Sequence, residues 1–168
     1  MNNIIIGSLT FHFQNNSIFS KYDEWSFYRN QFSKISVGVK AVDIILIESN
    51  VTWLIEVKDY RHHARTKVID LGEEIALKVR DTLAGLAAAR VNANDNTEKS
   101  FSNRALKTSK INIVLHLEQP NHTTRLMPKL IDTTKVLMKL KQLLKSIDPH
   151  PEIVNCNSLT NYMNWQVS

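Results

Sequence analysis

Two short runs rich in branched and aromatic residues, separated by only two polar residues, constrain the fold more than any other feature of this chain. Val42 to Glu48 reads VDIILIE, Val51 to Asp59 reads VTWLIEVKD, and Ser49-Asn50 lies between them. Such runs are typical of β-strands, and a two-residue polar connection is typical of a hairpin. The pattern therefore predicts two antiparallel strands that pair directly.

The turn fixes which residues face each other. If Ser49 and Asn50 form a two-residue turn, Asp43 lies directly opposite Glu56, and a symmetric four-residue turn gives the same register. Directly opposed residues have Cβ atoms about 4.5–5.5 Å apart, and Lys58 projects from the same face as Glu56. Two carboxylates and one ammonium group are therefore expected to converge.

The opposite face of the hairpin carries an apolar set that suits packing under a helix: Val42, Ile44, Leu46, Trp53, Ile55 and Val57. A slip of one residue would place both carboxylates in the core, so burial fixes the register. Like charges opposed across a ladder destabilise it, and a divalent cation between them is the simplest compensation. The alternative is a solvent-facing sheet edge with alternating charges.

Asp43 and the tripeptide Glu56-Val57-Lys58, within KAVDIILIESNVTWLIEVKDYR, resemble the motif of the PD-(D/E)xK nuclease superfamily. The usual proline before the aspartate is absent, because Val42 stands there. In length and order the chain is similar to the small Holliday-junction resolvases of that superfamily. The resemblance implies an α/β protein with the restriction-endonuclease-like αβββαβ core, a central mixed sheet flanked by helices.

The resemblance also implies a function, namely metal-dependent endonucleolytic hydrolysis of DNA phosphodiester bonds. Asp43, Glu56 and the carbonyl of Val57 would hold Mg²⁺ or Mn²⁺, and Lys58 would orient or help deprotonate the attacking water. Asp43, Glu56 and Lys58 are thus the expected catalytic residues. Glu24, on a helix before the strands, is a further candidate ligand, or else a charge favoured at a helix N-terminus.

A basic segment follows the second strand at the expected metal site. Its candidate phosphate-binding residues are Arg61, His62, His63, Arg65 and Lys67. Arginine can bind phosphate through two parallel hydrogen bonds, and protonated histidine can donate one. Solvated loop residues are the alternative interpretation of each of them taken singly.

Composition is consistent with one domain over residues 1–168, since 43% of the residues are hydrophobic and no shift divides the chain. The net charge of +5 and a pI near 9.4 suit a polyanionic partner. No window approaches the apolar length of a membrane span, and we expect a cytoplasmic protein without membrane contact. The single cysteine, Cys156, excludes an intrachain disulfide and is expected to be a small buried apolar residue.

The N-terminal half contains further predicted elements. Asn3 to Ile6 and Leu9 to Phe13 are β-prone around Gly7-Ser8, and a helix is expected from Tyr22 to about Phe32. The resemblance needs one more strand, from Ile35 to Lys40 or from the N-terminus.

After the hairpin, a capping box at Asp70 predicts a long helix to about Val91. Lys78 lies off its apolar stripe and faces either a substrate or, as the simpler interpretation, water. The polar segment from Asn92 to Lys110 is expected to be a mobile loop, either functional or disordered.

The C-terminal part begins with a strand expected from Ile111 to Leu117 and parallel to a hairpin strand. His116 and Glu118 could form a second metal or acid–base site, although a strand end near the surface explains them more simply. A helix from Asp132 or Thr133 to about Ile147 and an edge strand from Glu152 to Cys156 complete the prediction.

Other functions stay open at this stage. The chain could be a catalytically inactive nucleic-acid-binding or assembly subunit with the same fold, or an unrelated α/β interaction protein. DNA is the expected partner, a homodimer is expected by analogy, and a larger defence, repair or mobile-element complex is conceivable. The absence of a Gly-rich phosphate loop and of a Gly-x-Ser-x-Gly motif argues against a nucleotide-driven motor and a serine hydrolase.

Overall fold

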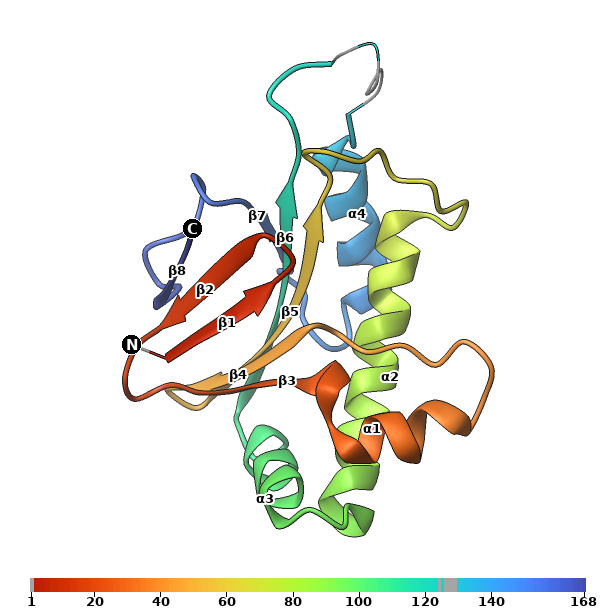
Figure 1. The fold of residues 1–168 in the computed structure, drawn as a ribbon, viewed down its shortest axis with the longest axis vertical. Coiled ribbons are helices and arrows are strands. Elements are labelled where there is room, and N and C mark those ends of the chain that lie inside the picture. Colours follow the sequence, from red (N-terminus) through yellow and green to blue (C-terminus); the bar gives the residue numbers. More distant parts are fainter. Residues whose placement is uncertain (1, 124, 126–129) are drawn as a thin grey trace.

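The structure, a computed structural model, describes residues 2–123, 125 and 130–168. Its strands form two sheets (Figure 1). The larger sheet has the order β3-β4-β5-β6-β7, with bounds Ile18–Lys21, Ile44–Glu48, Val51–Asp59, Lys110–Glu118 and Glu152–Val154. The smaller sheet has the order β1-β2-β8, with bounds Asn2–Ile6, Leu9–Phe13 and Trp165–Val167.

The predicted hairpin and its register are confirmed. β4 and β5 are antiparallel, and Ile44 pairs with Ile55, which extends to Asp43 opposite Glu56. The turn residues Ser49 and Asn50 have φ values of 48° and 64°. Positive φ at both central positions is the geometry of a type I′ turn, whose twist matches that of the flanking strands.

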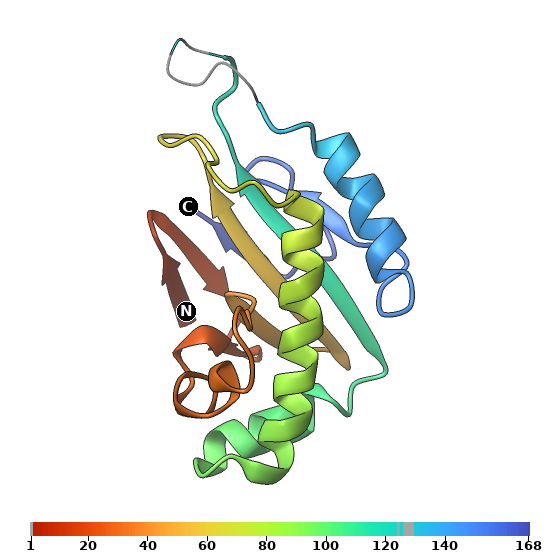
Figure 2. The same ribbon diagram turned by 90° about the vertical axis from the view of Figure 1, so that its right-hand side faces the viewer.

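The two faces of the larger sheet have different covers (Figures 1 and 2). Helices α2 (Leu71–Asn92) and α4 (Thr133–Leu144) lie on one face, and the smaller sheet lies on the other. The prediction that a helix covers the apolar face of the hairpin is wrong for every residue of that face except Val42. Ile44, Trp53 and Ile55 pack with Phe11 and Trp165 of the smaller sheet. The helices instead cover the face that carries Glu56, because neighbouring side chains there, such as those of Ile45 and Leu54, are apolar as well.

The connection from β5 to β6 is a helical crossover, and the two strands are parallel, as predicted. Helix α2 begins after Asp70, whose carboxylate accepts a hydrogen bond from Glu73 N at 3.1 Å. β7 pairs with β6 at the sheet edge, which confirms the predicted last strand of this sheet. Among the described residues, no helix is both long and apolar enough to cross a membrane.

The helix predicted from Tyr22 to Phe32 is divided into three short pieces. They are the 3₁₀ turn η1 (Tyr22–Glu24), helix α1 (Ser26–Asn30) and the 3₁₀ turn η2 (Phe32–Lys34). Trp25 separates the first two with an extended backbone, φ −60° and ψ 138°. Its indole is buried and donates to Ser20 Oγ, so side-chain packing interrupts the helical pattern.

The segment predicted as a mobile loop contains helix α3 (Asn96–Ala105), so that prediction is wrong. Asp95 caps its N-terminus by accepting from the backbone of Thr97 and Glu98. The buried Glu98 carboxylate in turn accepts from the backbone of Ser26 and Phe27, at 2.7 and 3.1 Å. Helix α3 is thus held by hydrogen bonds to a segment distant in sequence.

The strand predicted from Ile35 to Lys40 does not form. Lys40 N donates to Asp81 Oδ2 and Val42 N donates to Thr82 Oγ1, both at 3.0 Å. These backbone N–H groups, which precede β4, therefore bind side chains of α2 and not a neighbouring strand. The additional strand is β3, which pairs with β4. The coarse prediction of an α/β protein with a central mixed sheet flanked by helices is confirmed.

Candidate functional site

The predicted carboxylate pair comes together at the end of the hairpin. Asp43 directly precedes β4, and its Oδ2 accepts a hydrogen bond from Val57 N at 2.7 Å. This bond continues the contact between the two segments where the strand ladder has ended. Asp43 is therefore fixed beside Glu56, the residue that it faces in the extended register.

Glu56 is almost completely buried, with 1% of its surface exposed. Its Oε1 accepts from Lys58 Nζ at 2.5 Å and from Lys78 Nζ at 2.6 Å. Its Oε2 is buried and has no hydrogen-bond partner among the described residues. Burial, and then the charge of Asp43, raise the pKa of Glu56 to about 7, although both lysines act in the opposite direction.

Lys78, for which water was the simpler expectation than a substrate, belongs to the site. It projects from α2 to Glu56 and lies 3.8 Å from Asp43 Oδ1. Lys58, which contacts the same oxygen of Glu56, has a raised pKa: burial alone would lower it, but Glu56 and further carboxylates outweigh burial. Two ammonium groups, rather than one, therefore compensate the buried carboxylate.

A second buried carboxylate, Glu74 of α2, extends this charge network. Arg65 Nη2 lies 2.9 Å and Lys67 Nζ 2.5 Å from its oxygens, and Lys58 Nζ lies 3.8 Å away. Burial would raise the pKa of Glu74, but hydrogen bonds from Lys67 and Arg65 more than offset it and hold the pKa at about 2. Glu74 could not be recognised from the sequence, because a glutamate in the first turn of a helix is favoured there by the helix dipole.

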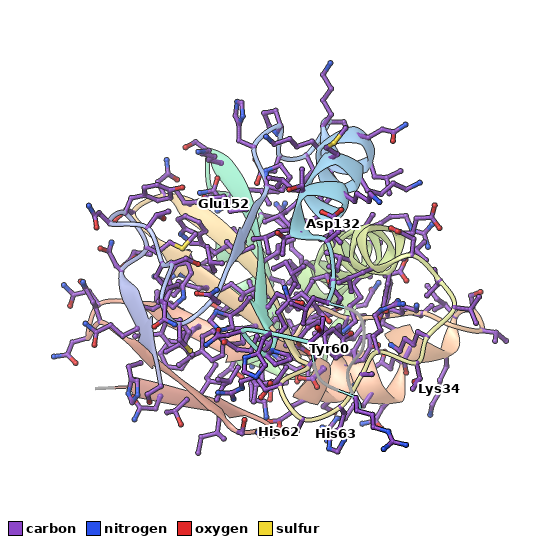
Figure 3. The ribbon with its side chains drawn as sticks, turned by 90° about the horizontal axis from the view of Figure 1, so that it is seen from above. Lys34, Tyr60, His62, His63, Asp132 and Glu152 are labelled. Atoms are coloured by element: carbon purple, nitrogen blue, oxygen red, sulfur yellow. The ribbon has the colours of Figure 1, made fainter. Side chains whose placement is uncertain are left out.

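The five basic residues predicted to hold phosphate do not form one open group. Arg65 and Lys67 are paired with Glu74, while Arg61 forms an ion pair with Asp59 at 2.7 Å. His62 and His63 are exposed on the loop that follows β5 (Figure 3). This loop therefore combines tethered cations with exposed imidazoles.

Glu24, predicted as an additional metal ligand, does not join the pair. Its carboxylate lies 2.5 Å from Lys21 Nζ, and 49% of the side chain is exposed. The preceding residue, Asp23, is affected by the site instead. Burial raises its pKa, and the charge of Asp43 raises it further. Asp23 Oδ1 is buried and, within the described chain, has no hydrogen-bond partner. Within the 3₁₀ turn η1, the charge of Asp43 thus affects the pKa of Asp23 and not that of Glu24.

Comparison with known proteins gives one informative similarity. The chain is 33% identical over 200 aligned positions to a cysteine–tRNA ligase of Neisseria meningitidis serogroup A / serotype 4A. The alignment covers 95% of this chain but 29% of the ligase, so the chain spans less than a third of that protein. No protein-family model and no solved structure matches.

This similarity contradicts the predicted function. The related protein is an aminoacyl-tRNA ligase, so the expectation of a Mg²⁺-dependent DNA endonuclease, and of a phosphodiester hydrolase in general, is wrong. The predicted residues do converge, but two carboxylates and two lysines form a charge network that does not specify one reaction. A fold-level resemblance likewise does not determine an activity.

Proposed function

We propose that this chain is a tRNA-binding domain that acts within, or together with, a cysteine–tRNA ligase. The observation that carries this proposal is the similarity to such a ligase along 95% of the chain. Because the chain spans only 29% of that protein, the proposal concerns recognition of the tRNA and not the ligation reaction itself.

The charge of the chain supports an RNA partner. Lysine and arginine exceed aspartate and glutamate to give a net charge of +5, and such an excess favours binding to phosphates through release of counterions. The surface at β5 and the following loop supplies Lys58, Lys67 and the exposed His62 and His63. Their proximity to the carboxylate site makes this the proposed RNA-binding surface.

We further propose that Asp43, Glu56 and the Val57 carbonyl would hold Mg²⁺, or Mn²⁺ in its place, and that the ion would supply positive charge for an RNA phosphate. Carboxylate and carbonyl oxygens are the preferred ligands of these ions, and the unpartnered Glu56 Oε2 suits one. A strand residue directs its N–H and C=O to the same side, so the Val57 carbonyl faces the side of Asp43. Binding of the ion would also release Lys58 and Lys78 from charge compensation.

The finer fold assignment is a proposal too. The order of β3, β4 and β5 as an antiparallel meander, followed by α2 and the parallel β6, supports a restriction-endonuclease-like core. The chain departs from the αβββαβ order in that α1 lies between the first two strands of the meander.

Binding of Mg²⁺ is expected to stabilise the folded chain above the pKa of Glu56. At about pH 8, saturating Mg²⁺ should raise the melting temperature by roughly 3–6 °C, because the ion binds only the folded state. The Glu56→Gln variant, which lacks the charged ligand, should show no shift. Differential scanning calorimetry with and without EDTA measures both, and equal shifts in the two proteins would place the ion elsewhere.

Binding of tRNA is tested by fluorescence anisotropy with a labelled transcript across a range of salt concentrations. The Lys58→Ala/Lys67→Ala variant, once circular dichroism shows that it is folded, is expected to bind about tenfold more weakly and to have a salt slope smaller by about 1–2. The matched control, Lys141→Ala/Lys145→Ala, removes the same charge from exposed positions around the end of α4. Equal losses in the two variants, or equal affinity for duplex DNA of the same length, would contradict the proposal.

A further inference from the structure

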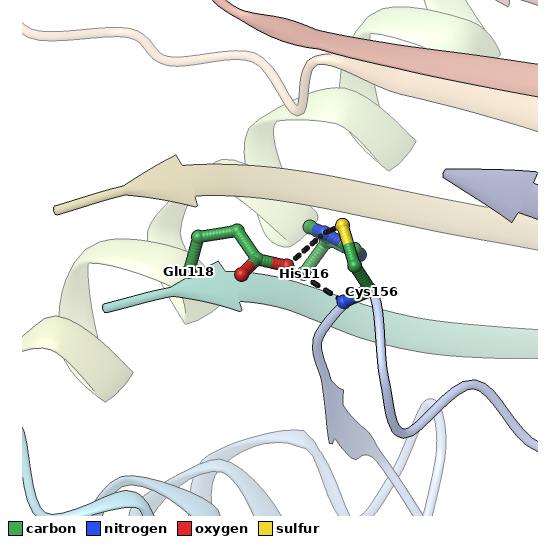
Figure 4. Close-up of side chains that lie close together, drawn as sticks. All are labelled: His116, Glu118 and Cys156. Atoms are coloured by element: carbon green, nitrogen blue, oxygen red, sulfur yellow. Dashed lines mark hydrogen bonds and ion pairs between the residues drawn. The ribbon is translucent and has the colours of Figure 1, made fainter. Parts of the chain in front are cut away.

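A second group of metal-ligating side chains lies on the opposite face of the larger sheet. His116 and Glu118 project from the same face of β6, and the segment after β7 brings Cys156 against them (Figure 4). Their ligand atoms all lie within 4.8 Å of one another. The expectation that His116 and Glu118 mark a strand end near the surface is wrong, since their exposed fractions are 0% and 8%.

The carboxylate of Glu118 and the thiol of Cys156 both contact the same ring nitrogen of His116. His116 Nε2 lies 2.9 Å from Glu118 Oε1 and 3.9 Å from Cys156 Sγ. Nδ1 of the same ring is buried and makes no hydrogen bond to the residues that the structure describes. The polar contacts of the ring are therefore concentrated at Nε2.

This convergence differs from the arrangement of a catalytic thiol. In a nucleophilic Cys–His–acid triad, the thiol contacts one ring nitrogen and the acid orients the ring through the other. Here the thiol and the carboxylate contact the same nitrogen.

The separations are close to those of a tetrahedral metal site. Zinc lies about 2.0–2.1 Å from histidine nitrogen, 2.3 Å from sulfur and 2.0–2.2 Å from a carboxylate oxygen. Tetrahedral angles then place the ligand atoms roughly 3.3–3.6 Å apart. The observed distances of 2.9 and 3.9 Å lie on either side of this range, and all three ligand atoms lie within 4.8 Å of one another.

The position of the group already restrains its ligands. Glu118 Oε1 accepts from Cys156 N at 2.7 Å, which ties the strand residue to the segment that carries the thiol. His116 packs edge-on against Phe11 of β2, with ring centroids 5.1 Å apart. The backbone and the smaller sheet therefore hold the donors together in advance of any ion.

We propose that His116, Glu118 and Cys156 bind Zn²⁺ as three protein ligands, with water in the fourth position. Imidazole, thiolate and carboxylate together select zinc over the hard cations Mg²⁺ and Ca²⁺. The partly exposed Cys156 leaves a path for solvent to the open position. This site is independent of the one at Asp43 and Glu56, which lies on the helix-covered face of the sheet.

Co²⁺ titration of the complete, metal-free chain tests this assignment, because tetrahedral Co²⁺ reports its ligands in its absorption spectrum. We expect one equivalent of Co²⁺ to produce a thiolate-to-cobalt charge-transfer band, and Zn²⁺ to abolish that band by displacement. Cys156 is the single cysteine of the chain, so the band can arise only from this residue. The Glu56→Gln variant should keep the band with unchanged affinity.

Variants of the other two ligands separate a three-ligand site from a lone thiol. Glu118→Gln is nearly isosteric, and His116→Asn removes the ring; each should weaken Co²⁺ binding more than about 100-fold, since loss of a direct ligand exceeds the usual effect of an outer-shell partner. Circular dichroism checks that each variant is folded. If His116→Asn does not fold, Glu118→Gln alone provides the test. Absence of the band in the folded wild-type chain, or undiminished affinity in folded Glu118→Gln, would overturn the proposal.

Discussion

Replacing Glu74 with alanine is expected to lower the free energy of unfolding by about 3–5 kcal/mol, the usual effect of removing one partner from a buried ion pair. Glu74 is fully buried and compensates Arg65, Lys67 and, at a longer distance, Lys58. Without it, three cations remain close together with only Glu56 nearby. Urea denaturation followed by circular dichroism measures the change.

Glu73 provides the matched control for this substitution. It occupies the neighbouring position of α2, but its side chain is 45% exposed and pairs with Lys139 at 2.8 Å. Exposed pairs contribute about 0–1 kcal/mol, so Glu73→Ala should have a small effect. A comparable loss in both variants would show that the buried network does not stabilise the fold.

The effect of Glu74 should depend on pH in a defined direction. Its pKa is about 2 in the folded chain, below its ordinary value of 4.5, so the folded state binds the proton less readily than the unfolded state. Its stabilisation is therefore complete above the ordinary pKa and is lost as the pH falls from there toward 2. The difference between the wild type and Glu74→Ala should shrink over the same interval.

Gly85→Ala is expected to destabilise the chain by about 1–3 kcal/mol, although alanine is the better helix former. Gly85 lies within α2, and a Cβ atom there would be 1.9 Å from the hydroxyl oxygen of Tyr22 and 3.1 Å from a ring carbon of Phe32. Both rings are buried, so the added methyl group forces them to move. Thermal and urea unfolding measure the loss.

A second substitution identifies the cause of that loss. The Tyr22 hydroxyl is buried and has no hydrogen-bond partner in the described structure, so Tyr22→Phe alone should be nearly neutral. In the double variant, Gly85→Ala should be less harmful by about 0.5–3 kcal/mol, the range of coupling between residues in contact. Strict additivity would show that the clash is absent.

The hairpin could be predicted from the sequence because its information is local. Alternating branched residues and a two-residue turn fix the register, and with it the position of Asp43 beside Glu56. The cover of each face could not be predicted in the same way. Apolar residues occur on both faces, and the choice between a helix and a second sheet depends on segments far away in the sequence.

The missed parts of the site share one physical origin. Lys78 and Glu74 lie on a helix whose ordinary amphipathic pattern assigns such residues to water, and only the tertiary fold brings Lys78 to Glu56 and buries Glu74. Helix α3 has few apolar residues, and its Glu98 finds backbone donors in α1. Short sequence motifs do not indicate which residues become partners in the tertiary structure.

The pairing of β2 with β8 determines when the smaller sheet can assemble. Ser168 and Thr10 exchange two backbone hydrogen bonds, and His12 contacts Ser168 across a separation of 156 residues. Contacts between such distant positions require closure of nearly the whole chain and therefore form slowly. During synthesis, the β1–β2 hairpin cannot pair with β8 until that strand has left the ribosome. Until then, the apolar face of β4 and β5 has an incomplete cover, and exposed apolar surface of this kind favours aggregation.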